Sequence, residues 1–492
     1  MSQPSPEPTA PSSPLIPPLV WVLAALAVLV RVGVAWGTHF TNEDALITLR
    51  YAENLAHGLG FVYNPGERVL GTTTPLYTLL LAVASWLGAP ALYVGKALNI
   101  AADGALCLVA YRWLTALGWE RAGRAAAFWI AVHPLHIRWA VSGMETSLVA
   151  LCGAAAWLAY THRRELPAYA LLAALFLLRW DGALLAGAVT VAFTIRERRI
   201  PWRGLALFLV LAAPWLAFAT LYFGSPLPGT AAAKMTVYNW PGALELFPGT
   251  RGVLTRLVEP AYLAAHLVAL IGLRQVVAAR SWALLPPLAW ALLYLGAIAA
   301  AVRVPVFEWY LVPPLPVHDL LVGIGIVTAA EPLCRRQPPA AGRLLAGTAA
   351  AVLAVGLVGW SYHAARTTQL IEDRLRKPMA LWLREQVAPG ETIMLEPIGY
   401  AGYFSGRRIL DVIGLVSPEV IPYWRRGGPS PLWEIARTRQ PEWIVLRPRE
   451  LENVTSAAGP EWEQQYARVR TFRYRRPRDR QPFVFYVYRR IP

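Results

Sequence analysis

The chain has 492 residues, of which 56% are hydrophobic and only 15% are charged, and its formal net charge is +16. An apolar content this high excludes an ordinary soluble enzyme and predicts a protein that spans a membrane over most of its length. The positive charges lie mainly in short connections between apolar segments and near the C-terminus, without a groove-reading or base-stacking module, so the sequence does not predict nucleic-acid binding.

The N-terminal region combines a polar tail with a first apolar segment. Residues 1–14 are rich in Pro and Ser and contain no Lys or Arg, so a disordered tail is expected rather than a secretory signal. Residues 15–36 are long enough to cross a hydrocarbon core of roughly 30 Å, and no small-residue cleavage pattern follows them. We therefore expect a first spanning helix here, at the start of a transmembrane domain over residues 15–365.

Further apolar segments follow, and with the first they predict roughly eleven spanning helices. The segment 167–195 is interrupted by Arg179, Trp180 and Asp181. This interruption leaves two interpretations open, which are one long tilted helix or two short helices that meet at depth. The other predicted segments are 74–89, 92–117, 124–141, 143–161, 203–223, 258–278, 281–302, 307–329 and 341–360.

Basic clusters in short loops indicate the orientation, because Lys and Arg favour the cytoplasmic side. The clusters at 196–203, 274–280 and 335–343 agree with one another if the loop 224–257 and the C-terminal domain lie outside the cytoplasm. The cluster at 112–124 also prefers the cytoplasm, yet simple alternation through three spans from a cytoplasmic N-terminus places it outside. The sequence leaves this conflict open.

After residue 365 the pattern changes to short alternating helical and extended stretches, which predict a small α/β domain over residues 366–492. The basic and aromatic stretch 468–480 is either an edge strand guarded by charges or a contact for anionic lipid or glycan. The expected fold class is thus an α-helical polytopic membrane protein with a small extracytoplasmic α/β domain. Extended stretches are predicted at 392–395, 408–413, 443–447 and 483–488.

Two adjacent carboxylates follow the first apolar segment. Glu43 and Asp44 lie at a membrane face and open an amphipathic helix, in the run Phe40-Thr41-Asn42-Glu43-Asp44-Ala45-Leu46-Ile47-Thr48-Leu49-Arg50. Acidic residues are electrostatically favourable at a helix N-terminus, so one interpretation of the pair is helix capping. The other interpretation is a catalytic one.

The first external loop, residues 38–73, resembles that of the GT-C glycosyltransferases. It is most similar to the bacterial group that contains the mycobacterial terminal arabinofuranosyltransferases, and protein mannosyltransferases are more distant. Two positions depart from the group, because Glu43-Asp44 stands where Asp-Asp is usual and Thr74 where Asn is common. The matching pieces are residues 43–69, Ser142-Gly143-Met144-Glu145-Thr146, Tyr222-Phe223-Gly224-Ser225-Pro226-Leu227-Pro228 with Lys234, Gly399-Tyr400, and Asp411-Val412-Ile413-Gly414-Leu415.

The resemblance implies a polyprenyl-phospho-sugar donor, an inverting single displacement and an acceptor that is an envelope glycan, a lipid or a protein. The residues agree with such a reaction, because an attacking hydroxyl needs a carboxylate to take its proton and the departing phosphate needs cations. We assign Asp44 as the base. Glu43 either orients the acceptor or helps to hold a divalent ion. We expect no cofactor and assign no metal ligands.

The candidates for binding the donor phosphate are cations at membrane depth or at the external ends of spans. Charged groups at such positions are costly and usually face a cavity. Lys234 lies in a long external loop that the resemblance marks, whereas Arg179 with Asp181 is equally well a structural ion pair. The full set is Arg50, Arg179, Lys234 and Arg303.

The candidates for contact with the acceptor or the sugar lie near the ends of apolar segments. A lone His at such an end is more often a packed helix-end residue than a ligand. Aromatic residues at a span entrance are also typical of an interfacial belt, so both interpretations stay open for them. The set is His133, Glu145, Asp181, Glu308, Trp309 and Tyr310.

Two other functions remain open on the sequence. A transporter or flippase of lipid-linked sugars would use many of the same polar groups, although no two-fold repeat is visible. A noncatalytic subunit of an envelope-assembly complex would use the C-terminal domain for binding, although the adjacent Glu43 and Asp44 argue against it.

Overall fold

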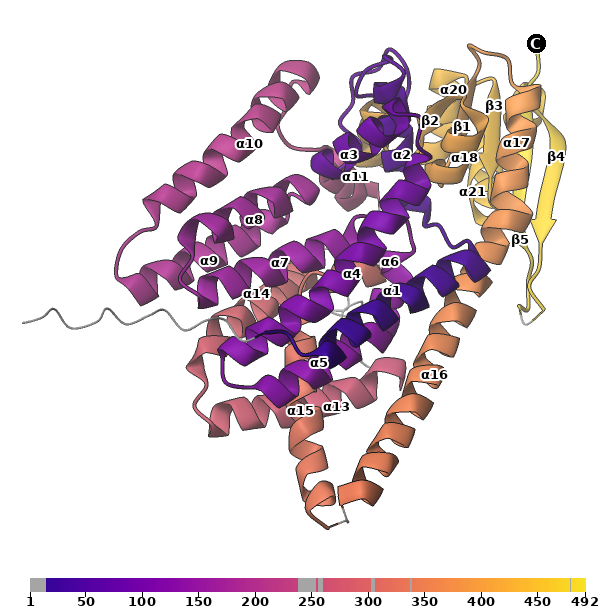
Figure 1. Ribbon diagram of the computed structural model, residues 1–492. Helices are drawn as coiled ribbons and strands as arrows, with labels where there is room; N and C mark the ends of the chain where they lie inside the picture. Colours follow the sequence, from indigo (N-terminus) through magenta and orange to yellow (C-terminus); the bar gives the residue numbers. More distant parts are fainter. Residues whose placement is uncertain (1–14, 238–253, 255–259, 302–305, 337–338, 478) are drawn as a thin grey trace, which may run out of the picture.

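The computed structural model describes residues 15–237, 254, 260–301, 306–336, 339–477 and 479–492 (Figure 1). A bundle of helices occupies most of the molecule, and a small domain with a β-sheet sits at one end of it (Figure 1). The chain passes from the bundle into this domain through a continuous helical segment at residues 339–386.

The bundle is formed by apolar helices that pack around a common core. Six described helical segments are long and apolar enough to cross a membrane, and they contain α1, α4, α10, α14, α15 and α16. The helices are α1 (Pro18–Thr38), α2 (Glu43–Ala56), α3 (Pro75–Trp86), α4 (Ala91–Ala116), α5 (Glu120–Val132), α6 (Pro134–Ala140), α7 (Thr146–Thr161), α8 (Glu165–Leu178), α9 (Gly182–Glu197), α10 (Trp202–Phe223), α11 (Thr230–Val237), α13 (Pro260–Ala278), α14 (Leu285–Ala301), α15 (Leu315–Arg336) and α16 (Pro339–Ile371).

Two of the expected spans are broken into pairs of helices. The segment 167–195 forms α8 and α9, which meet at Arg179–Asp181, so the interpretation with two short helices is confirmed. The segment 124–141 forms α5 and α6, because Pro134 cannot donate a backbone hydrogen bond and begins a new helix at its N1 position. Both breaks place polar residues inside the bundle.

The short helix α3 resolves the conflict over orientation. It has only 12 residues, or about 18 Å of helix, which is too short for a hydrocarbon core of roughly 30 Å. Lys96, near the start of α4, donates a hydrogen bond of 2.6 Å to the carbonyl oxygen of Phe40, which follows α1. α4 therefore begins on the side where α1 ends, and residues 112–124 lie on the opposite side.

The other basic clusters share that side of the bundle. Residues 196–203 join α9 to α10, residues 274–280 end α13, and the end of α15 and the start of α16 lie far from the C-terminal domain (Figure 1). The helix that follows each of these loops runs toward the C-terminal domain. All the basic loops thus lie at the end of the bundle away from that domain.

A buried chain of charges holds the bundle helices together. Arg31 of α1 donates a hydrogen bond of 2.6 Å to the Asp103 carboxylate of α4, and it also donates to two backbone carbonyls of α5. Asp103 Oδ1 lies 3.7 Å from His136 Nδ1, and His136 Nε2 lies 2.8 Å from Asp319 Oδ2 of α15. Since these side chains are fully buried, each charge depends on its neighbour for stabilisation.

The C-terminal domain contains a five-stranded sheet in the order β2-β1-β3-β5-β4. β1 (Thr392–Leu395) is parallel to β2 (Arg408–Asp411) and β3 (Trp443–Leu446), whereas β5 (Phe483–Arg490) is antiparallel to β3 and β4 (Tyr466–Tyr474). β4 is an edge strand of the sheet. The first part of the stretch 468–480 therefore forms a charged edge strand, which is one of the two interpretations given from the sequence. The helices are α17 (Lys377–Gln386), α18 (Ile398–Ser405), α19 (Ile421–Arg426), α20 (Pro431–Arg439), α21 (Pro448–Ala458) and α22 (Pro460–Gln465).

The domain is docked on α2 and the loop that follows it. Ile47 and Tyr51 of α2 share a buried cluster with Ile393 and Ile409 of the sheet. Asn64 extends the edge of the sheet, because its side-chain amide accepts from the backbone N–H of Ile409 and donates to the carbonyl of the same residue. The first external loop is therefore part of the interface between bundle and domain.

We predict that Asp103→Asn strongly destabilises the bundle, because it leaves Arg31 buried without a counter-charge. Breaking one side of a buried ion pair costs about 3–5 kcal/mol. The free energy of unfolding in mixed detergent micelles measures this loss. Glu120→Gln is the control, since Glu120 and Arg124 form an exposed pair and its loss should cost at most about 1 kcal/mol. Equal stability of the two variants would contradict the prediction.

Candidate functional site

The two adjacent carboxylates occupy the first turn of α2. Asn42 is the N-cap, and its Oδ1 atom accepts a hydrogen bond of 2.9 Å from the backbone N–H of Asp44. Because Asn42 already caps the helix, the side chains of Glu43 and Asp44 are not needed as caps, although the helix dipole favours them there. Both carboxylates are free to take other roles.

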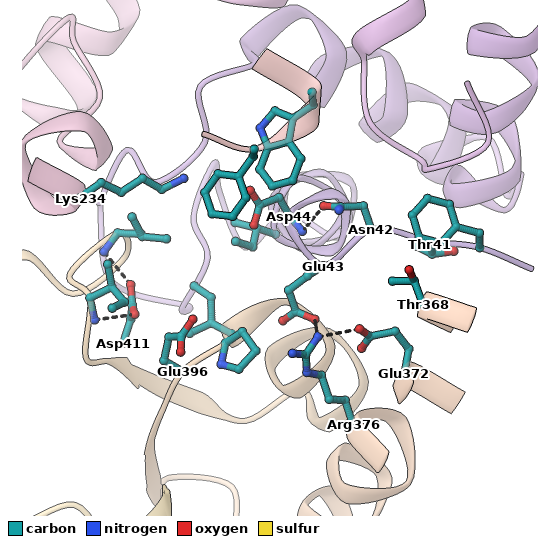
Figure 2. Close-up of a pocket in the computed structure, with 18 of the residues that line it drawn as sticks. Thr41, Asn42, Glu43, Asp44, Lys234, Thr368, Glu372, Arg376, Glu396 and Asp411 are labelled. Atoms are coloured by element: carbon teal, nitrogen blue, oxygen red, sulfur yellow. Dashed lines mark hydrogen bonds and ion pairs between the residues drawn. The ribbon is translucent and has the colours of Figure 1, made fainter. Parts of the chain in front are cut away.

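Two cavities meet at this turn. One, of about 290 Å³, lies between the bundle and the C-terminal domain and has Glu43 and Asp44 on its wall (Figure 2). The other, of about 530 Å³, extends into the bundle past Glu145 and Arg179. We call them the interface cavity and the bundle cavity. Five residues line both cavities, namely Asp44, Ile47, Lys234, Trp309 and Leu415.

The carboxylate of Asp44 forms no hydrogen bond or ion pair with any other described residue. Lys234 of α11 extends toward Asp44 from the opposite wall (Figure 2). Burial acts to lower the pKa of the Lys234 ammonium, but Asp44, Tyr310 and Asp411 together outweigh it, and the pKa lies above its usual value. A cation and a free carboxylate therefore face the same space.

Glu43 points away from Asp44, toward the C-terminal domain (Figure 2). Its Oε1 atom accepts from the backbone N–H of Tyr400 at 3.1 Å, and its Oε2 atom lies 3.7 Å from Nη1 of Arg376. Burial raises the pKa of Glu43 to about 7, even though Arg376 acts to lower it. Glycine at 399 permits this approach, because a Cβ there would collide with the Glu43 carbonyl oxygen.

The bundle cavity contains the break between α8 and α9. Arg179 pairs with Asp181 at 2.8 Å and with Glu145 at 3.6 Å, and Tyr294 donates a hydrogen bond of 3.1 Å to Asp181. All four residues line the cavity. Arg179 thus forms an ion pair with Asp181 and also lines the cavity.

A cluster of hydroxyl groups lies on the wall of the bundle cavity. The Oγ1 atoms of Thr48, Thr72 and Thr74 lie 3.1–3.4 Å from one another. Thr74 stands where the similar group commonly has Asn, and it keeps a polar side chain at this position. These hydroxyls offer hydrogen bonds to a polar ligand.

The loop after β2 closes the interface cavity from the domain side. Asp411 accepts backbone hydrogen bonds from Ile413, Leu415 and Val416, which folds the loop around its carboxylate. Burial raises the pKa of Asp411 to about 6, although these hydrogen bonds act to lower it. Ile413 and Leu415 then reach the cavity wall.

The structure brings most of the predicted site residues together. Asp44, Glu43, Lys234 and Trp309 line the interface cavity, and all but Glu43 also line the bundle cavity. Four further predicted residues line the bundle cavity alone. They are Arg179, Glu145, Asp181 and Tyr310.

Three predicted residues do not line either cavity. Arg50 is not among the lining residues, because its guanidinium donates to the carbonyls of Tyr63 and Arg407 and is thus used to hold the loop. His133 is buried, and its Nδ1 atom accepts from Leu135 at the start of α6. Glu308 pairs with Arg138 at 2.8 Å. Arg303 lies outside the described residues.

Several lining residues were not predicted from the sequence. Glu372 and Arg376 come from the helical segment that enters the C-terminal domain, and Tyr294 comes from α14. Their residue types carry no motif. The only available signal for Glu372 and Arg376 was a pair of opposite charges four residues apart, which is common on any helix.

The geometry bears on whether Glu43 and Asp44 share a metal ion. Their carboxylates point in different directions, and Glu43 is occupied by Arg376 and Tyr400 (Figure 2). Within the described ranges, no group of three or more His, Cys, Asp or Glu side chains has the arrangement of a metal site. The residues present therefore do not fit a divalent ion held by this pair.

We predict that Glu43 makes the folded protein less stable as the pH rises. Its carboxyl binds a proton more tightly when folded than when unfolded between pH about 4.5 and 7, so unfolding releases a proton in this range and stability falls with increasing pH. The effect amounts to up to about 3 kcal/mol. Melting temperatures in detergent between pH 5 and 8 should therefore decline less steeply for Glu43→Gln than for the wild type. Parallel profiles would refute the assignment.

Comparison with known proteins found similarity to a sequence family and to a curated glycosyltransferase. A sequence family described as a domain of unknown function (DUF8728) matches residues 360–488. The terminal β-(1→2)-arabinofuranosyltransferase of Mycobacterium tuberculosis (strain ATCC 25618 / H37Rv) is 29% identical in an alignment 407 residues long, which covers 73% of this chain and 63% of that protein. The chain thus spans less than two thirds of this relative's length.

Solved structures with little sequence identity share the architecture. ArnT from Cupriavidus metallidurans bound to undecaprenyl phosphate has a TM-score of 0.61 at 15% identity, over 95% of this chain and 97% of ArnT. The Archaeoglobus fulgidus oligosaccharyltransferase tethered to an acceptor peptide has a TM-score of 0.57 at 13% identity, over 93% of this chain and 72% of that chain. As residues 38–73 led us to expect, the chain shares the GT-C fold of these two structures.

Proposed function

We propose that the protein is an inverting glycosyltransferase that moves a sugar from a polyprenyl-phosphate carrier to an acceptor hydroxyl. The sequence relative is named as an arabinofuranosyltransferase, and the structural relative ArnT binds undecaprenyl phosphate. These likenesses support the reaction class and the lipid carrier. The acceptor is an envelope glycan, a lipid or a protein.

The observation that carries the proposal is the position of Asp44. Its carboxylate, free of partners within the described structure, stands on the wall shared by the two cavities. A base in this position contacts an acceptor that enters from one cavity and a donor that enters from the other. A group used only for stability would be expected to have a partner.

The donor is assigned to the bundle cavity. Ala183 and Leu184 of α9 and Ala297 and Ile298 of α14 give this cavity an apolar side, which suits a polyprenyl chain. Lys234 and Arg179 supply positive charge on the polar side, where the phosphate would lie. The sugar then lies near the threonine hydroxyls and Asp44.

The proposed chemistry is a single displacement. The acceptor oxygen attacks the anomeric carbon, the bond from that carbon to the phosphate oxygen breaks, and Asp44 takes the proton of the acceptor hydroxyl. The phosphate gains negative charge as it leaves, and the Lys234 ammonium stabilises it. One displacement inverts the anomeric configuration. We propose that no divalent ion takes part, since Glu43 is bound to Arg376 and Tyr400.

We further propose that both cavities face the extracytoplasmic side of a cell membrane. The basic loops at 112–124, 196–203, 274–280 and 335–343 share the end of the bundle away from the C-terminal domain, and basic loops favour the cytoplasm. This assignment places the domain outside the cytoplasm and makes a lipid-linked donor necessary, because soluble nucleotide sugars are cytoplasmic.

We predict that Asp44→Asn lowers the rate of transfer by about 10² to 10⁴-fold, because the amide keeps the shape of the side chain but cannot accept a proton. The measurement is transfer from a panel of polyprenyl-phospho-sugars in reconstituted vesicles. Lys234→Ala should act differently and weaken donor use, through loss of a charge-assisted contact of roughly 1.5–3 kcal/mol. A folded Asp44→Asn protein that transfers sugar at the wild-type rate would refute the assignment of Asp44 as the base.

Orientation gives a separate prediction. A phosphatase fused after residue 88 should be active outside the cytoplasm, because α3 does not span the membrane, and a fusion after Pro492 should be active as well. A fluorescent reporter after residue 118 should be bright in the cytoplasm. A cytoplasmic position for residue 88 would show that α3 spans, and a cytoplasmic Pro492 would reverse the whole orientation.

A further inference from the structure

We propose that the interface cavity binds a vicinal diol of a neutral carbohydrate, held by Glu372 and Arg376 together with Glu43. The proposal rests on the transferase function and gives the acceptor a chemical class, which is the hydroxyl-bearing end of a sugar chain rather than an amine or an anionic group. Glu372 and Arg376 are then the residues that select the acceptor.

Both residues come from an unusual turn of helix. α16 continues into η3 (Glu372–Arg376), which is a π-helix, and then into α17. π-helical turns are rare and occur frequently at functional sites, because they change the direction in which side chains point. Here the turn lies where the bundle joins the C-terminal domain, and both of its end residues face the interface cavity (Figure 2).

The guanidinium of Arg376 lies next to two carboxylates. Arg376 Nη1 donates to Glu372 Oε1 at 2.6 Å and lies 3.7 Å from Glu43 Oε2. Both acids are largely buried, and the exposed fraction of the Glu372 side chain is 6%.

Three polar atoms of this group have no hydrogen-bond partner within the described structure, although all are buried. They are Glu43 Oε2, Glu372 Oε2 and Arg376 Nε. Buried polar atoms are costly when they are unsatisfied, so such a set calls for a ligand or water. Two acceptors and one donor on a cavity wall define which ligand groups would fit.

A pair of sugar hydroxyls fits this set better than other acceptor groups. A hydroxyl both donates and accepts, so two of them can donate to the carboxylate oxygens while one accepts from Arg376 Nε. An ammonium group can donate to the carboxylates but has no acceptor for that N–H. A phosphate or carboxylate would meet more carboxylates than cations, because the cavity is lined by Glu43, Asp44, Glu372, Glu396 and Asp411 against Lys234, Arg376 and Arg447.

The rest of the cavity is consistent with a sugar ring. Phe307 and Trp309 stack with ring centroids 4.3 Å apart, and both line the cavity, so an aromatic face is available to the apolar side of a ring. Thr41 and Thr368 add polar groups on the wall. A volume of about 290 Å³ lies at the lower end of the range for small-molecule sites, which suits a sugar unit.

Glu43 links this site to the proposed base. It belongs to the diol-binding group and precedes Asp44 in the same helical turn. A sugar held at Glu43 and Glu372 thus reaches the wall that Asp44 shares with the bundle cavity. A free hydroxyl of that sugar is then presented to Asp44.

The test measures the affinity of methyl glycosides for the detergent-solubilised protein in the absence of donor. Binding is followed by titration with saturation-transfer NMR. The probes are a methyl hexopyranoside and a methyl pentofuranoside with free diols, their di-O-methyl ethers, and the corresponding uronic acids. We expect at least one free diol to bind about 10- to 100-fold more tightly than its ether and its acid. Absence of binding by both free diols, or equal binding of diol and ether, would overturn the proposal.

Variants locate the contact. Glu372→Gln should weaken binding of the free diol to the level of the ether and leave binding of the ether unchanged. Asp373→Asn is the matched control, because Asp373 is the next residue of the same turn, is partly exposed, and does not line the cavity. If Glu372→Gln preferred the free diol over the ether as strongly as the wild type does, the assignment of Glu372 as a diol ligand would be overturned. If that variant fails to fold, the comparison of diol with ether in the wild type still tests the site.

The binding site and the transferase can fail separately. Sugar transfer is measured on the same samples with a polyprenyl-phospho-sugar, and the acceptor KM should rise about 10- to 100-fold in Glu372→Gln while hydrolysis of the donor is unchanged. Diol-selective binding without any transfer would support the site and refute the proposed reaction. Transfer with no preference for the free diol would refute the site and support the reaction.

Discussion

The first turn of α2 is held from both sides, and the arrangement of the two cavities depends on this clamp. From the bundle, the Ser142 carbonyl accepts from the backbone N–H of Asn42 at 2.8 Å. From the segment leading to the C-terminal domain, Gln369 accepts from the backbone N–H of Thr41 at 2.9 Å, and Tyr400 donates to Glu43. Thr41, Asn42 and Glu43, which precede Asp44, are each held by a hydrogen bond, while the Asp44 side chain has no partner among the described residues. A carboxylate on a rigid support is what positioning for proton transfer requires.

Charges inside the bundle divide into two kinds that hydropathy alone does not separate. Arg31 and Asp103 satisfy each other in a sealed network and have no exposed surface. Arg179 and Asp181 are also paired, yet they line a cavity at a broken helix. Because both kinds carry the same cost of burial, only the space around them distinguishes a structural pair from one that faces a ligand.

Much of the architecture followed from the sequence because it rests on local patterns. The interruption at Arg179 left a break as one of two interpretations, and the β-rich stretches at 392–395 and 443–447 became β1 and β3. The apolar stretch 74–89 forms a helix of only 12 residues, because hydropathy reports composition and does not fix helix length. The strand at Tyr466–Tyr474 was less evident, since its charged residues interrupt the hydrophobic alternation.

The site was predictable only where a local motif carried it. Glu43 and Asp44 were found because they are adjacent at a helix start, and Lys234 because it follows a recognisable loop. Glu372 and Arg376 lie more than 300 residues from Glu43 along the chain, and their contact arises from docking that no local pattern encodes. The position of Arg50 was unpredictable for a similar reason, because its backbone partners at Tyr63 and Arg407 are set by tertiary folding.

The continuous helical path from α16 through η3 to α17 makes the angular phase of one helix a determinant of the interface. Each residue of an α-helix advances the chain by about 100°, so the wider π turn sets the direction of everything that follows it. A π turn holds about one residue more than an α turn, so converting it to regular α-helix at unchanged chain length would rotate α17 and the attached sheet by up to about 100°. Gly399 would then no longer meet Glu43, and the carboxylates of Glu43 and Glu372 would face different surroundings. The extra residue of this single turn thus sets the orientation of the C-terminal domain relative to the bundle.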